Sequence, residues 1–121
     1  MKQHVKSIRT FIGAKNYEIS RRFYHDFGFE EIRVFPTMSY FKMGDFGFYL
    51  QDAYVKDWIE NSMIFIEVND LETQLKTIKS LQLDQKYENV RVTEISCNDW
   101  GNEFFVYDPS GILWHIGEFS S

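Results

Sequence analysis

The sequence predicts an α+β fold in which two βαβββ modules form a curved mixed sheet around a cleft. Three observations predict it. The order strand, helix, three strands occurs twice, the helix cap Asn16 recurs as Asp70 at an offset of 54 residues, and a tight turn at 108–111 joins the last two strands. A chain of 121 residues suits one domain with a modest core. We therefore expect a single domain over 1–121, with internal modules at 5–52 and 61–119.

The first module opens with a predicted strand from Ser7 to Ala14. Asn16 then suits the N-cap of a helix, and Gly28 suits its end. The apolar face of this helix has four-residue spacing and consists of Ile19, Phe23 and Phe27. Three strands are predicted after it, interrupted at Pro36 and at a Gly-Asp-Phe-Gly turn, over 29–35, 38–43 and 48–51.

The second module repeats this order after a linker from Asp52 to Asn61. Residues 63–68 predict a strand, and Asp70 suits the cap of a helix. Its apolar positions are Leu71, Leu75 and Ile78. Strands are then expected over 90–98, 103–107 and 112–118. The last two form a hairpin because Asp108-Pro-Ser-Gly111 has the residue order of a type I turn.

The composition narrows the classes of function. The formal net charge is −5, which argues against nucleic-acid binding, since that rests on clustered Lys and Arg. An acidic balance favours a cationic ligand, although solubility explains most surface carboxylates equally well. Aromatic residues make up 18% of the chain, more than so small a core needs, so some rings should line a cavity or an interface.

Cys97 is the single cysteine, so no intrachain disulfide is possible and a reducing compartment is expected. The N-terminal residues lack the apolar stretch of a secretory signal, and no apolar run approaches the length of a membrane span. We therefore expect a soluble, cytoplasmic protein with no membrane partner.

The segment from Trp100 to His115 carries a motif: Trp-Gly-x-Glu-Phe at 100–104, Asp-Pro-x-Gly at 108–111, and a histidine four residues after that glycine. It resembles the last hairpin of the vicinal-oxygen-chelate superfamily, which includes glyoxalase I, extradiol dioxygenases, fosfomycin-resistance enzymes and bleomycin-resistance proteins. The bleomycin-resistance form is the most similar, because the metalloenzymes usually carry a glutamate where His115 stands. The resemblance implies the glyoxalase/bleomycin-resistance fold and a homodimer.

The positions that hold metal in the metal-dependent members can be located in this chain. The repeat places Arg9 and Met63 on the first strand of each module, and His115 with either Tyr49 or Gln51 on the last. Arginine has no lone pair to donate at neutral pH, and a thioether is a poor ligand for Zn, Ni, Mn or Fe. Since a catalytic site normally takes about three protein ligands, we expect no metal and no cofactor here.

His115 should face the cleft, with Leu113 and Gly117 on the same side and Trp114 and Ile116 on the other. The simpler interpretation is a hydrogen-bonded, half-buried histidine, and the alternative is a ligand-contacting or proton-handling role. Trp100 matches the tryptophan that borders the drug groove in bleomycin-resistance proteins.

Further candidates to line the cleft are Tyr40, Phe48, Tyr49 and Trp58. Core packing is the simpler reading for the first three. Trp58 lies in the polar linker, where a ligand or dimer contact competes evenly with packing. Arg9 is unusual in a strand and needs a partner, either Glu67 or Glu118 or an anionic group of a ligand.

These features favour a metal-free protein that binds a small molecule, with a flat aromatic or cationic compound sequestered in a groove of a homodimer. The alternative is a superfamily enzyme of the lyase, isomerase or dioxygenase type that uses His115 in an atypical site. A module without a small ligand is a third possibility.

Overall fold

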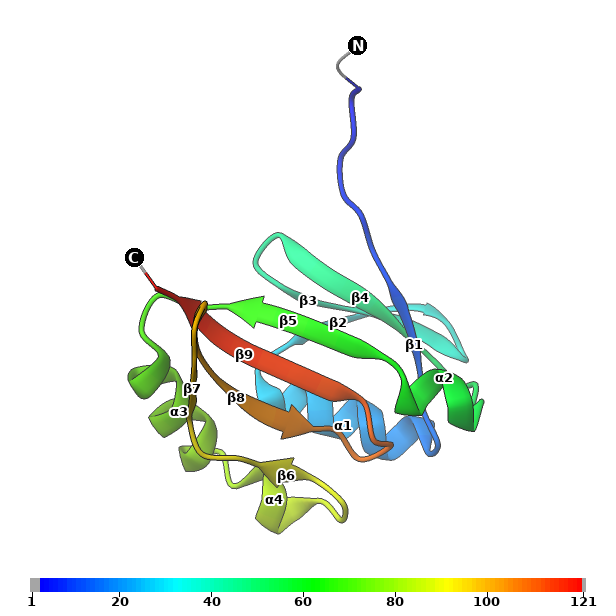
Figure 1. The fold of residues 1–121 in the computed structure, drawn as a ribbon. Coiled ribbons are helices and arrows are strands. Elements are labelled where there is room, and N and C mark those ends of the chain that lie inside the picture. The colour runs from blue at the N-terminus through cyan, green and yellow to red at the C-terminus, as the bar shows by residue number, and fades with distance from the viewer. Residues whose placement is uncertain (1–2, 121) are drawn as a thin grey trace.

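The computed structural model describes residues 3–120, which form two mixed sheets with helices packed against them (Figure 1). Sheet A contains β1 (Phe11–Gly13), β2 (Glu30–Phe35), β3 (Met38–Met43) and β4 (Phe46–Gln51) in the order β1-β4-β3-β2. β1 runs parallel to β4 with Phe11 opposite Tyr49, whereas β2, β3 and β4 are antiparallel. The first module of the sequence therefore builds one sheet.

Sheet B repeats this arrangement with the second half of the chain. β5 (Met63–Glu67) runs parallel to β9 (Leu113–Phe119), with Phe65 opposite His115. β8 (Gly101–Tyr107) pairs antiparallel with β9, and its other edge takes β6 (Arg91–Val92) and β7 (Ser96–Asn98). The two parallel pairs correspond, because the Phe11–Tyr49 and Phe65–His115 pairs occupy the same place in each sheet.

The main helices begin and end where the sequence predicts. α1 (Tyr17–Phe27) begins after Asn16, whose side chain accepts a hydrogen bond from the Ile19 amide, and ends at Gly28 with φ +120°. α3 (Leu71–Ser80) begins after Asp70, which accepts from the Thr73 amide in the same way. Both caps satisfy amide groups that a helix start leaves without partners.

Several elements differ from the expectation. The strand expected over 7–14 is restricted to β1, because residues before Thr10 have no neighbouring strand within the described chain and extend from the body as an arm (Figure 1). The expected strand 90–98 is split into β6 and β7, since the Thr93 side chain accepts from the Phe105 amide in place of a regular ladder. The linker also contains a short helix, α2 (Lys56–Glu60), and α4 (Leu83–Lys86) follows α3.

One hydrophobic core joins the inner faces of both sheets to the helices. Phe48 of sheet A and Trp114 of sheet B are buried, and their ring centroids are 5.4 Å apart. Tyr24 of α1 lies 4.9 Å from Phe48 and 5.7 Å from Trp114. Since the two sheets share a core through these faces, their opposite faces, called the outer faces here, point away from it. Among the described residues no helix is long and apolar enough to span a membrane.

A buried polar network fixes α1 to the last hairpin. The Tyr24 hydroxyl donates to Asp108 Oδ2 at 2.6 Å and accepts from Trp114 Nε1 at 3.0 Å. The other carboxylate oxygen of Asp108 accepts from the amides of residues 110, 111 and 112, which closes the turn before β9. Burial raises the pKa of Tyr24 well above its usual value, and it also raises the pKa of Asp108.

We predict that Tyr24→Phe lowers the free energy of unfolding by about 2–4 kcal/mol, because it leaves a buried carboxylate oxygen and a buried indole N–H without their partner. Urea unfolding followed by tryptophan fluorescence measures this change. Tyr54→Phe is the matched control, since Tyr54 is exposed and its loss should change stability by less than about 0.5 kcal/mol. Equal effects of the two substitutions would contradict the role of the network.

A second polar cluster joins α1 to β2 and β3. Glu31 is almost buried and accepts from Arg21 at 2.7 and 2.9 Å, and it also bonds Ser39 and His25. The His25 side chain is half-exposed and contacts this carboxylate. Burial raises the pKa of Glu31, but the hydrogen bonds from Arg21, Ser39 and His25 outweigh it and lower this pKa to about 2.

Because the pKa of Glu31 is lower in the folded state than in the unfolded chain, its contribution to stability is complete above pH 4.5 and is lost as the pH falls toward 2. We predict that Glu31→Gln reduces the free energy of unfolding by about 2–3 kcal/mol at pH 7, and that the difference from the wild type vanishes near pH 2. Urea titrations at several pH values test this, and a difference independent of pH would contradict it.

Candidate functional site

Aromatic and charged side chains gather on the outer face of each sheet. The sheet A cluster consists of Arg9, Phe11, Tyr40 and Tyr49. The sheet B cluster consists of Phe65, Trp100, Phe105, His115 and Phe119. Strand alternation contributes to both, because Tyr49 lies next to the core residue Phe48 and His115 lies next to the core residue Trp114.

In the sheet A cluster, an arginine lies on two tyrosines. The Arg9 guanidinium is 3.9 Å from the centroid of the Tyr40 ring, and Arg9 Nη1 donates to the Tyr49 hydroxyl at 2.9 Å. Phe11 stacks on Tyr49 with ring centroids 4.8 Å apart. Gly47 leaves room for Tyr40, since a Cβ at that position would lie 2.6 Å from the tyrosine ring.

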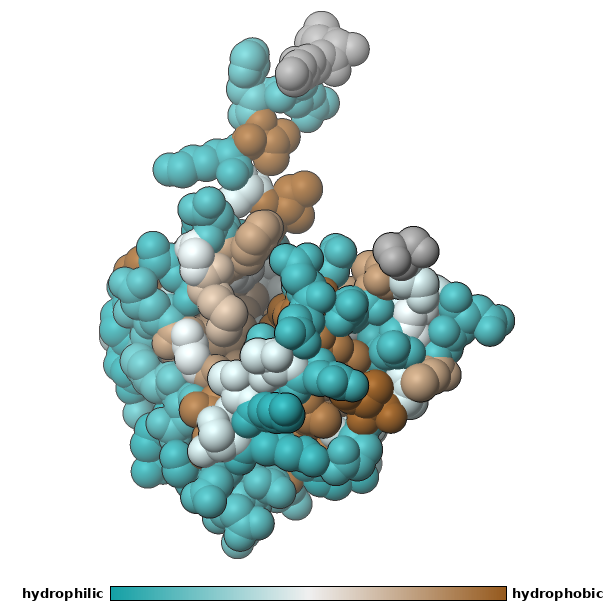
Figure 2. All heavy atoms as spheres, turned by 90° about the vertical axis from the view of Figure 1, so that its left-hand side faces the viewer, coloured by the Kyte–Doolittle hydropathy of each residue, from teal (hydrophilic) through white to brown (hydrophobic). Residues whose placement is uncertain are grey.

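This cluster lines a groove of about 670 Å³ at the base of the arm. Figure 2 shows apolar side chains gathered there, where the surface is hollowed. Ile32 and Val34 of β2 contribute apolar walls, and the charged residues of the lining are Lys6, Arg9, Lys42 and Asp45. A groove of this size accommodates a small organic molecule.

In the sheet B cluster, a histidine is held by a carboxylate. His115 Nδ1 lies 2.8 Å from Glu103 Oε1, and His115 Nε2 lies 3.4 Å from Met63 Sδ. The His115 side chain is 22% exposed and that of Glu103 12%, so the pair is largely shielded but reachable. Since a carboxylate only accepts, the contact places the proton of a neutral imidazole on Nδ1, and Nε2 faces the Met63 sulfur.

Rings surround this pair. Phe65, Trp100 and Phe119 lie within 5.2–5.9 Å of one another by ring centroid, and Phe105 is 4.9 Å from His115. Gly117 makes the packing possible, because a Cβ there would lie 2.6 Å from Phe65 and 3.2 Å from Trp100. Phe65 is 42%, Trp100 37% and Phe119 52% exposed, so the chain itself leaves this aromatic surface uncovered.

The residues that the sequence predicts for the cleft lie at different places in the structure. Arg9, Tyr40 and Tyr49 meet on sheet A, and Trp100 and His115 lie on sheet B. Phe48 is a correction, since it is 3% exposed and belongs to the core on the opposite face of β4. Trp58 is 71% exposed on α2, outside both clusters. No contact joins the two clusters among residues 3–120, because the outer faces diverge from the common core.

Arg9 has neither of the carboxylate partners that its place in the sequence suggests. Among the described residues no carboxylate lies within ion-pair distance of it. Glu118 instead accepts from the Leu71 amide at 2.8 Å and so helps to cap α3. The guanidinium charge therefore remains available on the surface of the groove.

The structure shows where the four positions lie that the resemblance assigns to a metal. They fall on Arg9 and Tyr49 in sheet A, which bond each other, and on Met63 and His115 in sheet B. Tyr49 rather than Gln51 is the counterpart of His115 in register. Only His115 is a good ligand for a divalent metal in this set, and no three His, Cys, Asp or Glu side chains of the described chain converge on one point.

Sequence reasoning missed Glu103, Phe65, Phe105 and Phe119. Two of them, Glu103 and Phe105, could have been found from the predicted hairpin. Counting back across the turn at 108–111 places Phe105 opposite His115 and Glu103 opposite Gly117, on the same face of the sheet. Phe65 follows from the parallel pairing of β5 with β9, which a single sequence does not specify.

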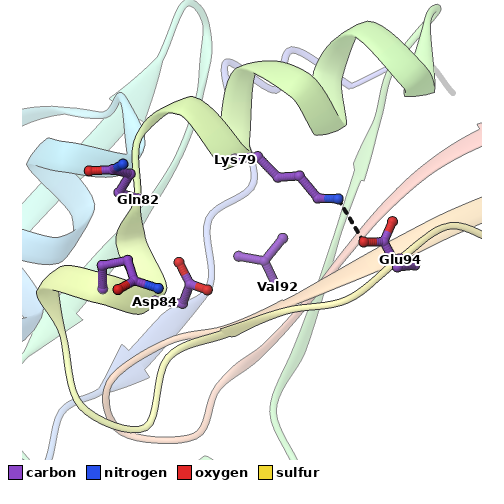
Figure 3. A pocket seen from close by; sticks show the side chains of 6 residues that line it. Lys79, Gln82, Asp84, Val92 and Glu94 are labelled. Atoms are coloured by element: carbon purple, nitrogen blue, oxygen red, sulfur yellow. Dashed lines mark hydrogen bonds and ion pairs between the residues drawn. The ribbon is translucent and has the colours of Figure 1, made fainter.

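A second hollow, of about 480 Å³, lies between α3, α4 and β6 and differs in character (Figure 3). Its lining is polar apart from Val92, and Lys79 crosses it to bond Glu94 at 2.6 Å. Lys79 and Glu94 of this hollow are already paired with each other, and no aromatic side chain of the described residues lines it. It therefore suits an organic ligand less well than the outer faces do.

Comparison with solved structures finds proteins of the same fold. The bleomycin-binding protein from bleomycin-producing Streptomyces verticillus, complexed with copper(II)-bleomycin, superposes with a TM-score of 0.79 at 18% identity, over 99% of this chain and 100% of that one. The bleomycin resistance determinant encoded on transposon Tn5 gives 0.78 at 15% identity, over 95% and 99%. The chain has the glyoxalase/bleomycin-resistance fold.

The same fold occurs in an enzyme. The lactoylglutathione lyase from Agrobacterium tumefaciens matches with a TM-score of 0.70 at 17% identity, over 96% of each chain. No protein-family model matches the sequence, and no curated protein sequence does. The resemblance seen in the hairpin motif is thus supported at the level of the glyoxalase/bleomycin-resistance fold, which hosts both binding proteins and enzymes.

The orientation of His115 leads to a spectroscopic prediction. In neutral His115 the proton resides on Nδ1, because Glu103 accepts a hydrogen bond from this nitrogen. The ¹⁵N chemical shifts should therefore show a protonated Nδ1 and an unprotonated Nε2. In Glu103→Ala the ring should shift toward the Nε2-protonated tautomer that free imidazole prefers. His4, outside this cluster, is the internal control. A wild-type His115 protonated on Nε2 would contradict the assigned geometry.

Proposed function

We propose that the protein binds and sequesters a planar aromatic compound, without a metal, in grooves shared between two chains of a homodimer. The single observation that supports this most is the uncovered aromatic surface around His115, where three rings and a glycine form a flat apolar wall. Exposed rings gathered in this way are uncommon on a monomer surface and are typical of ligand grooves and interfaces.

The donor set supports the metal-free part of the proposal. Arg9 and Tyr49 occupy two of the positions that the resemblance assigns to a metal and are joined by a hydrogen bond, and Met63 occupies a third. A compound held by such residues would be removed from solution by affinity and protein concentration, so no turnover is required.

A second chain is needed because the two clusters point away from each other within one chain. The arm also favours a partner, because it extends from the body of the molecule (Figure 1) and carries Val5 and Ile8, which are 62% and 92% exposed. In the proposed dimer, the arm packs on the second chain, and the sheet A cluster of one chain faces the sheet B cluster of the other. Burial of these side chains would favour association.

We predict that planar aromatic probes, tested as a panel that includes bleomycin and 2-naphthoate, quench tryptophan fluorescence with saturation at one molecule per chain. Phe65→Ala should weaken binding by about tenfold or more, since a ring that stacks on the probe is lost. Tyr54→Ala, which removes an exposed ring outside the clusters, should leave it unchanged. Absence of saturable binding across the panel would overturn the proposal.

An enzyme of the same fold is the second candidate, and the His115–Glu103 pair favours it, because a carboxylate that orients an imidazole is a common arrangement for general acid–base catalysis. The two candidates differ in the fate of the compound. Mass spectrometry of the recovered probe after prolonged incubation should show it chemically unchanged. Conversion that is lost in His115→Ala would favour the enzyme instead.

The dimer can be tested separately. We predict that light scattering of the wild type gives about twice the mass of the 14.5 kDa chain, and that Ile8→Glu shifts the equilibrium toward monomer because it places a charge in an apolar contact. Gln85→Glu, which adds the same charge on exposed α4, is the control and should remain dimeric. A monomeric wild type at micromolar concentration would contradict the shared groove.

A further inference from the structure

We infer that the groove at Arg9 selects an aromatic acid, so that the ligand carries a carboxylate or a similar planar anion in addition to its ring. This inference rests on the proposed binding function and specifies the chemical class of its ligand. It specifies the charge of the ligand, which the aromatic surface of sheet B does not determine.

The position of the Arg9 guanidinium is the first step. A guanidinium has five N–H donors, and the described contacts of Arg9 use one of them, to the Tyr49 hydroxyl at 2.9 Å. The ring of Tyr40, 3.9 Å away, supports the opposite face of the plane and limits its rotation. The remaining donors form a fork that suits the two oxygens of a carboxylate.

The balance of charge in the groove is the second step. Three cations, Lys6, Arg9 and Lys42, line it together with one carboxylate, Asp45. Lys42 lies opposite Glu30 across the β2–β3 pair, so part of its charge is compensated, whereas Arg9 has no such neighbour among residues 3–120. The groove is therefore locally positive, although the net charge of the chain is −5. Its positive charge is a property of this groove and not of the surface as a whole.

The walls of the groove are the third step. Tyr40 and Tyr49 line the groove beside the guanidinium, and Ile32 and Val34 complete an apolar side. A small inorganic anion would leave these walls uncovered, whereas an aromatic acid places its ring against them and its carboxylate on Arg9. A cationic compound of the same shape would bring like charge to Arg9.

Matched probes test the inference. Isothermal titration would compare 2-naphthoate with 2-naphthylmethylammonium and with neutral 2-naphthalenemethanol, which share a ring system and differ in charge. We expect 2-naphthoate to bind about tenfold or more tightly than the ammonium compound, and this preference to fall at high salt. Arg9→Gln should abolish the preference and retain binding of the neutral alcohol. Arg22→Gln, on the exposed side of α1, should retain the preference.

The outcomes separate the inference from the proposed function. If none of the three probes binds, the proposed aromatic groove itself fails. If the ammonium compound binds as tightly as 2-naphthoate or more tightly, aromatic binding stands and the selection of an acid is overturned. If 2-naphthoate is preferred but Arg9→Gln leaves that preference intact, the anion is held elsewhere and the role of Arg9 is overturned. Urea unfolding of Arg9→Gln should match the wild type, which excludes a general loss of structure.

Discussion

The hydrogen bonds of the Tyr24 hydroxyl hold the two halves of the molecule in their relation to each other. This group lies on α1, which packs on sheet A, yet its partners belong to the turn before β9 and to β9 itself in sheet B. With Phe48 and Trp114 it forms a core in which the inner faces of both sheets meet. Because a buried hydroxyl, indole and carboxylate satisfy one another only in one geometry, the network specifies how the sheets are placed.

That placement determines what the outer faces can do. The sheets turn their inner sides to a shared core, so the two aromatic clusters point outward in one chain and neither is covered by the other. Each cluster carries a different chemistry: sheet A presents a guanidinium on tyrosine rings, and sheet B presents an imidazole oriented by a carboxylate among phenylalanine and tryptophan rings. A ligand that touched both would be held by stacking on one side and by charge on the other.

The sequence predicted the elements better than their assembly. Asn16, Gly28 and Asp70 mark helix ends through local backbone chemistry, so both ends of α1 and the start of α3 could be predicted from single residues. Strand alternation likewise separated His115 from Trp114. It could not assign Phe48, because choosing the inner face of β4 depends on its pairing with β1 and β3. Residues 7–10 of the arm were expected to be part of a strand, since the sequence of an extended segment does not show whether a neighbouring strand is present.

The most direct test of the account is a crystal structure of the protein with 2-naphthoate. The account predicts a dimer in which the carboxylate of the probe meets Arg9 of one chain and its ring lies against Phe65 and Trp100 of the other. A probe bound in a groove of one chain alone, or bound in the shared groove with its carboxylate turned away from Arg9, would contradict it.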